Sequence, residues 1–247
     1  MRTNLGSSVE TVVNRFLSHL PADHANRLRL RLRRLSRPAR LGSLRRTSPI
    51  SDDFGYDRGS PIDRYYIEQF LADRRKDIHG RVLEVKDRTY TNRFGVGVTQ
   101  RDVIDINPQN PHATIIANLA AANDVPDGTF DCFILTQTLQ FIYDTYAAVA
   151  HAHRILKSPG TLLVTVPAVS AIVNDSELTD YWRFTPASCS EIFGGVFGHA
   201  AVRVRAYGNV LTSIAFLAGL ACEELTRDEL ETHDDRFSLI VSVCAVK

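Results

Sequence analysis

The sequence has little of what marks membrane-spanning, disulfide-stabilised and metal-binding proteins. The 247 residues include four cysteines, one methionine and one tryptophan, and no two cysteines have the C-x-x-C spacing of zinc or redox sites. No apolar run approaches the roughly 18 residues of a membrane span, and the first residues lack the apolar core of a secretory signal. The chain also lacks a Walker loop, a G-x-S-x-G elbow and a histidine pair with metal-ligand spacing. We therefore expect no bound metal and no transmembrane segment.

The four cysteines predict the compartment. They are scattered along the chain, and Cys132 and Cys244 lie within apolar runs; the other two are Cys189 and Cys222. Free cysteines in such surroundings behave as small buried apolar residues. The sequence therefore predicts reduced thiols and a cytoplasmic protein.

Charge is nearly balanced overall but unevenly distributed. The net charge is +1, yet residues 24–48 carry nine arginines and no acid, whereas residues 223–235 carry seven acids and one arginine. Leu28, Leu32 and Leu35 recur at helical spacing, which predicts an amphipathic helix that packs on the domain or on a protein partner, a second copy included. Nucleic acid is not expected, since no aromatic residues interleave the arginines. An anionic membrane remains an alternative, and Glu10 and Asp23 argue against a mitochondrial presequence.

The length suits one α/β domain with an extension. Residues 1–47 are predicted to be a basic, partly helical or mobile extension, and residues 48–247 the domain, with a pocket-covering segment at 48–79 and a core at 80–247. Strands are predicted near 81–86, 102–107, 113–117, 130–136, 161–166, 201–206 and 238–247, and helices near 62–77, 142–156, 186–193 and 209–225. Strands that alternate with helices favour a parallel sheet with right-handed crossovers.

Two of the apolar runs carry an acid. Glu84 lies in the first run, and Asp105 lies near the end of the second. A carboxylate at the end of a second parallel strand suits the two hydroxyls of a ribose. The glycine-rich phosphate loop of a dinucleotide site is absent, because Lys86-Asp87-Arg88 follow the first strand. This combination favours a nucleoside ligand without a pyrophosphate.

A resemblance to a known family rests on the order of several short segments. They are Leu83–Val85, Val103–Ile106, Asn118-Leu119, residues 130–141, the R-x-L-K run with its following strand at 154–167, and Tyr181–Pro186. In this order and spacing, residues 80–247 resemble a class I S-adenosylmethionine-dependent methyltransferase of the small-molecule, type 11-like kind. The glycine loop after the first strand departs from the family pattern.

The resemblance implies a Rossmann-like, seven-stranded, mostly parallel sheet with helices on both faces and an antiparallel last strand. It implies S-adenosyl-L-methionine as the cofactor. The cofactor-binding residues that it implies are Arg64, Glu84, Thr91, Asp105, Ile106, Asn118, Leu119, Thr136 and Gln137. Candidate substrate-binding residues are Tyr66, Trp182 and Arg183, and candidate catalytic residues are Tyr65, Tyr181 and Arg183.

The implied reaction is methyl transfer to oxygen or nitrogen of a small natural-product or sugar-like acceptor by in-line displacement. Such a reaction depends mainly on alignment, and a general base is needed only for a protonated acceptor. An alternative is a binding or scaffold protein with the same fold that has lost methyl transfer, which the degenerate loop favours. A nicotinamide-dependent oxidoreductase is disfavoured because the G-x-G-x-x-G motif is absent.

Overall fold

The structure is a computed structural model that describes residues 20–36, 38, 40–173 and 178–247. The chain divides into two compact units, Met1–Thr47 and Ser48–Lys247. In the described part of the first unit, helix α2 (Ala22–Ser36) is followed by the 3-10 turn η1 (Gly42–Leu44). None of the helices in the described ranges is long and apolar enough to cross a membrane.

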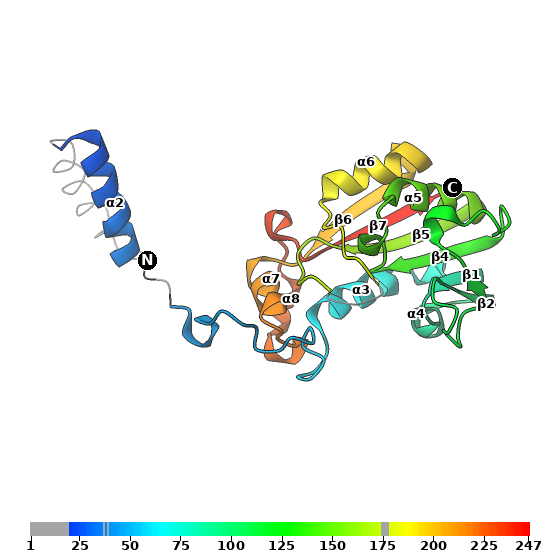
Figure 1. Cartoon of the computed structure of the whole chain (residues 1–247), viewed down its shortest axis with the longest axis horizontal. Helices are drawn as coiled ribbons and strands as arrows, with labels where there is room; N and C mark the ends of the chain where they lie inside the picture. The colour runs from blue at the N-terminus through cyan, green and yellow to red at the C-terminus, as the bar shows by residue number, and fades with distance from the viewer. Residues whose placement is uncertain (1–19, 37, 39, 174–177) are drawn as a thin grey trace. The chain divides into compact units, whose positions relative to one another are not determined.

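A seven-stranded sheet forms the centre of the second unit (Figure 1). Its strands are β1 (Gly80–Val85), β2 (Val98–Asp105), β3 (Ile115–Ile116), β4 (Phe130–Thr136), β5 (Leu156–Pro167), β6 (Val202–Tyr207) and β7 (Ile240–Val246). Their order is β3-β2-β1-β4-β5-β7-β6, and β7 alone runs antiparallel to its two neighbours. The predicted Rossmann-like fold with an antiparallel last strand is confirmed.

Helices cover both faces of this sheet, as Figure 1 shows. The side chains of β5 explain why: Leu162, Val164 and Val166 belong to the core on one face, and Leu163 belongs to the core on the other, as the two-residue period of a strand requires. Helices α5 (Thr145–Ile155) and α6 (Pro186–Phe197) pack over the first core. Helices α3 (Ile62–Asp73), α4 (Thr89–Phe94) and α7 (Val210–Leu217) pack over the second.

Two predicted helices are shorter than expected. The helix expected at 62–77 ends at Asp73 and continues as the 3-10 turn η2 (Arg75–Asp77). The helix expected at 209–225 ends at Leu217, and the chain then forms η6 (Cys222–Glu224) and α8 (Arg227–Glu231). Gly219 stops α7, because it takes a left-handed conformation with φ +75° that terminates helices. A side chain at Gly219 would collide with the backbone of Ser51.

The topology brings several strand ends to one edge of the sheet. The strands β1, β2, β4, β5 and β6 point the same way, so their carboxyl ends lie along one edge, where the antiparallel β7 begins. Open α/β sheets bind ligands outside the carboxyl ends of their strands. A ligand-binding site is therefore expected at this edge.

Candidate functional site

The turn after β1 keeps a glycine-like backbone without a glycine. Lys86 has φ +72°, a left-handed conformation that costs a non-glycine residue about 1–2 kcal/mol. Its N–H donates to the carbonyl of Ile104 (3.1 Å), and its own carbonyl accepts from the Asn110 amide (2.7 Å). These bonds hold the turn in the strained shape. Strain of this kind at the end of a strand is typical of ligand sites.

Glu84 holds the segment that follows this turn. Its buried carboxylate accepts the N–H of Tyr90 (2.9 Å), the N–H of Thr91 (2.7 Å) and the hydroxyl of Thr91 (2.6 Å). The first-strand acid and Thr91, both predicted to bind the cofactor, therefore contact each other. All three bonds are made inside the protein, so Glu84 fixes the start of α4. Burial raises the pKa of Glu84 above its usual value, against the effect of these hydrogen bonds.

Asp105 lies half-buried at the end of β2, on a polar groove of about 700 Å³. The groove is lined by residues 86–89, Asn92, Asp105 and five residues of the loop 107–112. The Asp105 carboxylate accepts from the Asn107 N–H (2.9 Å) and from the Asn110 side-chain amide (2.5 Å). A carboxylate has about four acceptor positions, so two remain for the hydroxyls of a ligand.

The predicted cofactor-binding residues near Asp105 differ in their exposure to solvent. Ile106 is 57% exposed beside the groove loop, and Leu119 is buried in the core. Asn118 is exposed, and its side-chain oxygen accepts the Ala120 N–H (3.0 Å), which caps the 3-10 turn η3 (Leu119–Ala121). Its side-chain amide donors make no protein hydrogen bond in the described residues.

The end of β4 has a second strained residue. Gln137 has φ +47°, and its N–H donates to the carbonyl of Thr165 at the end of β5 (2.8 Å). Thr136, just before it, is half-buried. The side-chain amide nitrogen of Gln137, the side-chain oxygen of Gln140 and the hydroxyl of Thr165 are buried without a hydrogen-bond partner in the described structure. Buried polar groups of this kind call for an explanation, and a bound ligand is one.

The segment before the sheet contributes one residue near this edge. The Arg64 guanidinium donates to the hydroxyls of Tyr90 on α4 (2.8 Å) and Tyr56 (3.1 Å). This leaves the second terminal nitrogen of Arg64 without a protein partner in the described residues. Arg58, by contrast, holds Glu224 as a fork, with its Nε 2.9 Å from the carboxylate.

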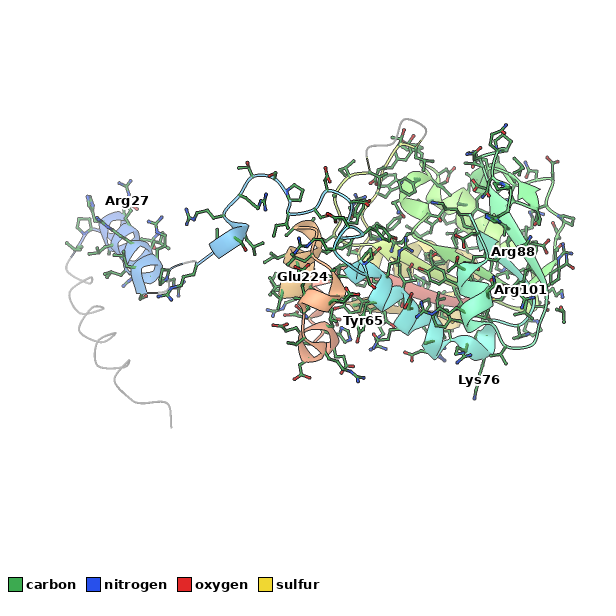
Figure 2. The ribbon with its side chains drawn as sticks, turned by 90° about the horizontal axis from the view of Figure 1, so that it is seen from below. Arg27, Tyr65, Lys76, Arg88, Arg101 and Glu224 are labelled. Atoms are coloured by element: carbon green, nitrogen blue, oxygen red, sulfur yellow. The ribbon has the colours of Figure 1, made fainter. Side chains whose placement is uncertain are left out.

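The two tyrosines of α3 do not join Arg64. Tyr66 is fully buried, and its hydroxyl donates to the Leu230 carbonyl (2.8 Å). Its prediction as a substrate-binding residue is corrected, because a side chain enclosed in the core cannot reach an acceptor. Tyr65 lies against the η6–α8 segment: the pKa of its hydroxyl is raised first by burial and then by Glu231. In Figure 2, Glu224 lies toward the opposite end of the domain from Arg88, and Tyr65 lies between them.

Arg183 is committed to a structural role. Its guanidinium holds both carboxylate oxygens of Asp180 (2.5 and 2.9 Å) and donates to the carbonyl of Ala171 (2.7 Å). The Arg183 hydrogen bonds hold the pKa of Asp180 below its usual range, although burial of that carboxyl acts in the other direction. The two terminal nitrogens of Arg183 are thus occupied within the loop after β5, and its Nε is buried without a partner in the described residues. These bonds give Arg183 a structural role.

Tyr181 and Trp182 join Tyr143 in an aromatic cluster at the end of β4. The Tyr181 ring meets Tyr143 edge-on at 5.4 Å, and the Trp182 ring lies 6.0 Å from it. The Trp182 N–H donates to the Ile142 carbonyl (3.1 Å). All three rings are exposed, Tyr143 by 71% and Tyr181 by 45%. Sequence reasoning missed Tyr143, because nothing in its local pattern distinguishes it from a surface residue.

An apolar pocket of about 360 Å³, which the sequence did not predict, lies farther along the same edge. It is lined by the start of the loop after β5, the two residues just before α6, one face of α7 and the residues before β7: Ala168, Val169, Phe184, Thr185, Val210, Ser213, Ile214, Leu217, Arg236, Phe237 and Ser238. These segments are far apart in the sequence, so no local motif could have revealed the pocket. In the described residues, no cluster of three histidine, cysteine, aspartate or glutamate side chains could hold a metal ion.

The edge therefore suits a nucleoside with an amino-acid tail. Asp105 offers acceptors for ribose hydroxyls, Arg64 a free donor for a carboxylate, and Gln137, Gln140 and Thr165 unpaired polar atoms. A family model described as a methyltransferase domain matches residues 80–164, the part of the chain that builds β1 to β4 and most of β5. The chain therefore contains a methyltransferase domain.

Solved structures of methyltransferases are similar to this chain at low sequence identity. An S-adenosylmethionine-dependent methyltransferase from Archaeoglobus fulgidus is 12% identical, with 74% of this chain and 94% of that chain covered and a TM-score of 0.49. A 1,6-didemethyltoxoflavin-N1-methyltransferase from Burkholderia thailandensis, with S-adenosylhomocysteine bound, is 11% identical, with 78% and 80% covered and a TM-score of 0.48. No curated protein matches the chain.

Proposed function

We propose that this methyltransferase transfers a methyl group to oxygen or nitrogen of a small-molecule acceptor. The observation that carries the proposal is the Lys86 turn, which keeps the left-handed backbone of a glycine loop directly beside the Asp105 groove. A chain without a ligand at this edge has no reason to retain that strain, since a glycine would relieve it.

The residues at the edge have separate roles in this proposal. Asp105 binds the ribose hydroxyls, Arg64 binds the amino-acid carboxylate, and Glu84 fixes the backbone between them through Tyr90 and Thr91. When bound there, S-adenosylmethionine supplies an electrophilic methyl group that an acceptor lone pair takes by in-line displacement. The protein's contribution is alignment and exclusion of water.

The acceptor belongs on the β4–β5 side of the edge. The cluster of Tyr143, Tyr181 and Trp182 offers exposed ring faces that stack on a planar or sugar-like molecule. Tyr181 is the catalytic candidate that this placement favours, because Arg183 is held by Asp180 and Tyr65 lies against α8. We also propose a cytoplasmic location, since all four cysteines are free thiols.

Titration with S-adenosylhomocysteine tests the cofactor part first. Binding to the native state alone raises the free energy of unfolding by about 2.7 kcal/mol at a hundredfold excess over Kd. A panel of hydroxyl- and amine-bearing acceptors, with release of S-adenosylhomocysteine as the readout, then tests transfer. No thermal shift at saturating ligand would reject the cofactor site as a whole.

A second candidate is a binding protein that has lost methyl transfer. The side chains of Lys86, Asp87 and Arg88 line the groove where the family has glycines, and side chains there keep a ligand farther from the backbone. This candidate predicts that S-adenosylhomocysteine binds while no acceptor in the panel is methylated. Turnover of any acceptor rejects it.

A further inference from the structure

Helix α2 has a feature that methyl transfer does not use. Leu28, Leu32 and Leu35 are spaced i, i+4 and i+7, so they form one row along the helix. The row at the same spacing on one side of it is Arg27, Arg31 and Arg34, and on the other side lie Arg29 and Arg33. A narrow apolar row is thus flanked by guanidinium groups on both sides.

The exposure of these residues fits an external partner. The five arginines of α2 are exposed, and Leu32 and Leu35 are exposed by 38% and 70%. Figure 2 shows Arg27 projecting away from the helix axis. No salt bridge to these arginines occurs among the described residues. The basic run continues past the helix as Arg40, Arg45 and Arg46.

The acidic segment of the chain does not complement this charge. Glu224 is held by Arg58, Glu231 by Arg227 and Asp234 by Arg236. Glu223 accepts from Ser60, and Glu229 from the N–H of Thr226. Most of its carboxylates are therefore already paired, which argues against a second copy of the chain as the partner of α2.

We propose that α2 lies on the surface of a bilayer that contains anionic phospholipids. The leucine row then enters the boundary of the acyl chains, and the flanking arginines reach the lipid phosphates, which their planar forks bind well. Residues 22–48 contain no aromatic residue to stack on bases, so the chemistry favours lipid phosphate over single-stranded nucleic acid. The proposal is independent of methyl transfer.

Flotation of the full-length protein with vesicles tests the proposal. We expect binding to vesicles of phosphatidylcholine with phosphatidylglycerol, little binding to phosphatidylcholine alone, and weaker binding as salt is raised. The triple variant Arg27→Gln, Arg31→Gln, Arg34→Gln should lose about a hundredfold in affinity, because each basic residue near an anionic leaflet contributes about 1 kcal/mol. The double variant Leu32→Gln, Leu35→Gln should also bind less.

A matched control replaces three exposed arginines of the second unit, Arg101, Arg203 and Arg227, with glutamine. These changes alter the net charge equally and should leave vesicle binding near the wild-type level. An equal loss in this control would reject α2 as the binding element. Equal binding to both kinds of vesicle, or binding to a duplex RNA but to neither vesicle, would also overturn the proposal. Circular dichroism and thermal unfolding serve as the check that each variant is folded and keeps its helix content.

Discussion

The two halves of the sheet edge are built differently. Around β1 and β2 the surface is polar, strained at Lys86, and connected by hydrogen bonds between Glu84, Asp105 and the loops around them. Around β5, α7 and the start of β7 the surface is apolar, and in the loops after β4 and β5 Tyr143 and Trp182 expose their rings. The first half lies within the family match at 80–164, and the apolar pocket lies beyond it.

This difference separates what the family shares from what the chain has of its own. A cofactor common to a family needs the same hydroxyl and carboxylate partners in each member. An acceptor particular to one protein is recognised by loops and helices that vary. Changes in the first half should therefore act on cofactor binding and on the fold, and changes in the second half on the acceptor alone.

The largest effect is expected at Glu84. Replacing Glu84 with alanine leaves the N–H groups of Tyr90 and Thr91 and the Thr91 hydroxyl without their buried acceptor. Unpaired buried donors cost about 1–3 kcal/mol each, so we expect about 2–4 kcal/mol lower stability after partial hydration. Urea unfolding measures the loss directly. Thr91→Val, which removes the hydroxyl alone, is the matched smaller change. A Glu84→Ala protein as stable as wild type would show that α4 is not held this way.

The next effect concerns Asp105. Asp105→Ala should weaken S-adenosylhomocysteine binding by about 1–3 kcal/mol, which is about fivefold to 150-fold, because the ribose hydroxyls lose a charged acceptor. Calorimetric titration measures the change. Asp127→Ala is the control, since Asp127 is an exposed partner of Arg154 away from the groove.

The same titration on Trp182→Ala tests the division between the halves. Cofactor affinity should stay within a factor of about two, because Trp182 bonds to Ile142 in the aromatic cluster and does not line the groove. A loss comparable with that of Asp105→Ala would mean that the two halves are a single site.

Much of the fold could be predicted because the signals were local. The apolar runs of β1, β2, β4 and β5 matched buried strands, and Thr185-Pro186 marked the start of α6, where Thr185 caps the helix as expected. The antiparallel last strand came with the family resemblance. Helix α4 was not predicted, because its six residues are too few to show a helical repeat of apolar residues. The end of α7 was predicted wrongly, because it depends on the close contact between Gly219 and the backbone of Ser51.

The site could be predicted only in part, for a similar reason. The acids Glu84 and Asp105 stand at strand ends, which a sequence shows. Sequence alone could not show that the Tyr66 hydroxyl reaches the Leu230 carbonyl, since these two residues come together only on folding. The apolar pocket is lined by four separate segments between Ala168 and Ser238, so no short stretch of sequence indicates it.

A smaller effect is expected at the strained turn. Lys86→Gly removes the cost of a left-handed lysine and should raise the free energy of unfolding by about 0.5–1 kcal/mol, after the entropy lost on fixing a glycine. Arg88→Gly is the matched control: Arg88 has φ −116°, where glycine only adds entropy cost, so it should lower stability. If both glycine variants are destabilised alike, the Lys86 turn is not strained, and the observation on which the cofactor proposal rests is removed.

The smallest expected effect is a difference in pH dependence between the halves. The pKa of Glu84 is raised by burial from an ordinary 4.5, so its protonated form favours the fold: its contribution is present below about 4.5 and is lost as the pH rises through the folded-state pKa. The pKa of Asp180 is lowered from an ordinary 3.8, so its contribution is present above about 3.8 and is lost as the pH falls. The stability advantage of wild type over Glu84→Gln should therefore shrink as the pH rises, and its advantage over Asp180→Asn should shrink in acid. Unfolding in urea across the pH range measures both differences.

The two stability differences should change in opposite directions with pH. If both change in the same direction, one of the two carboxyl groups is not in the environment described. The variant whose difference has the unexpected slope identifies that group.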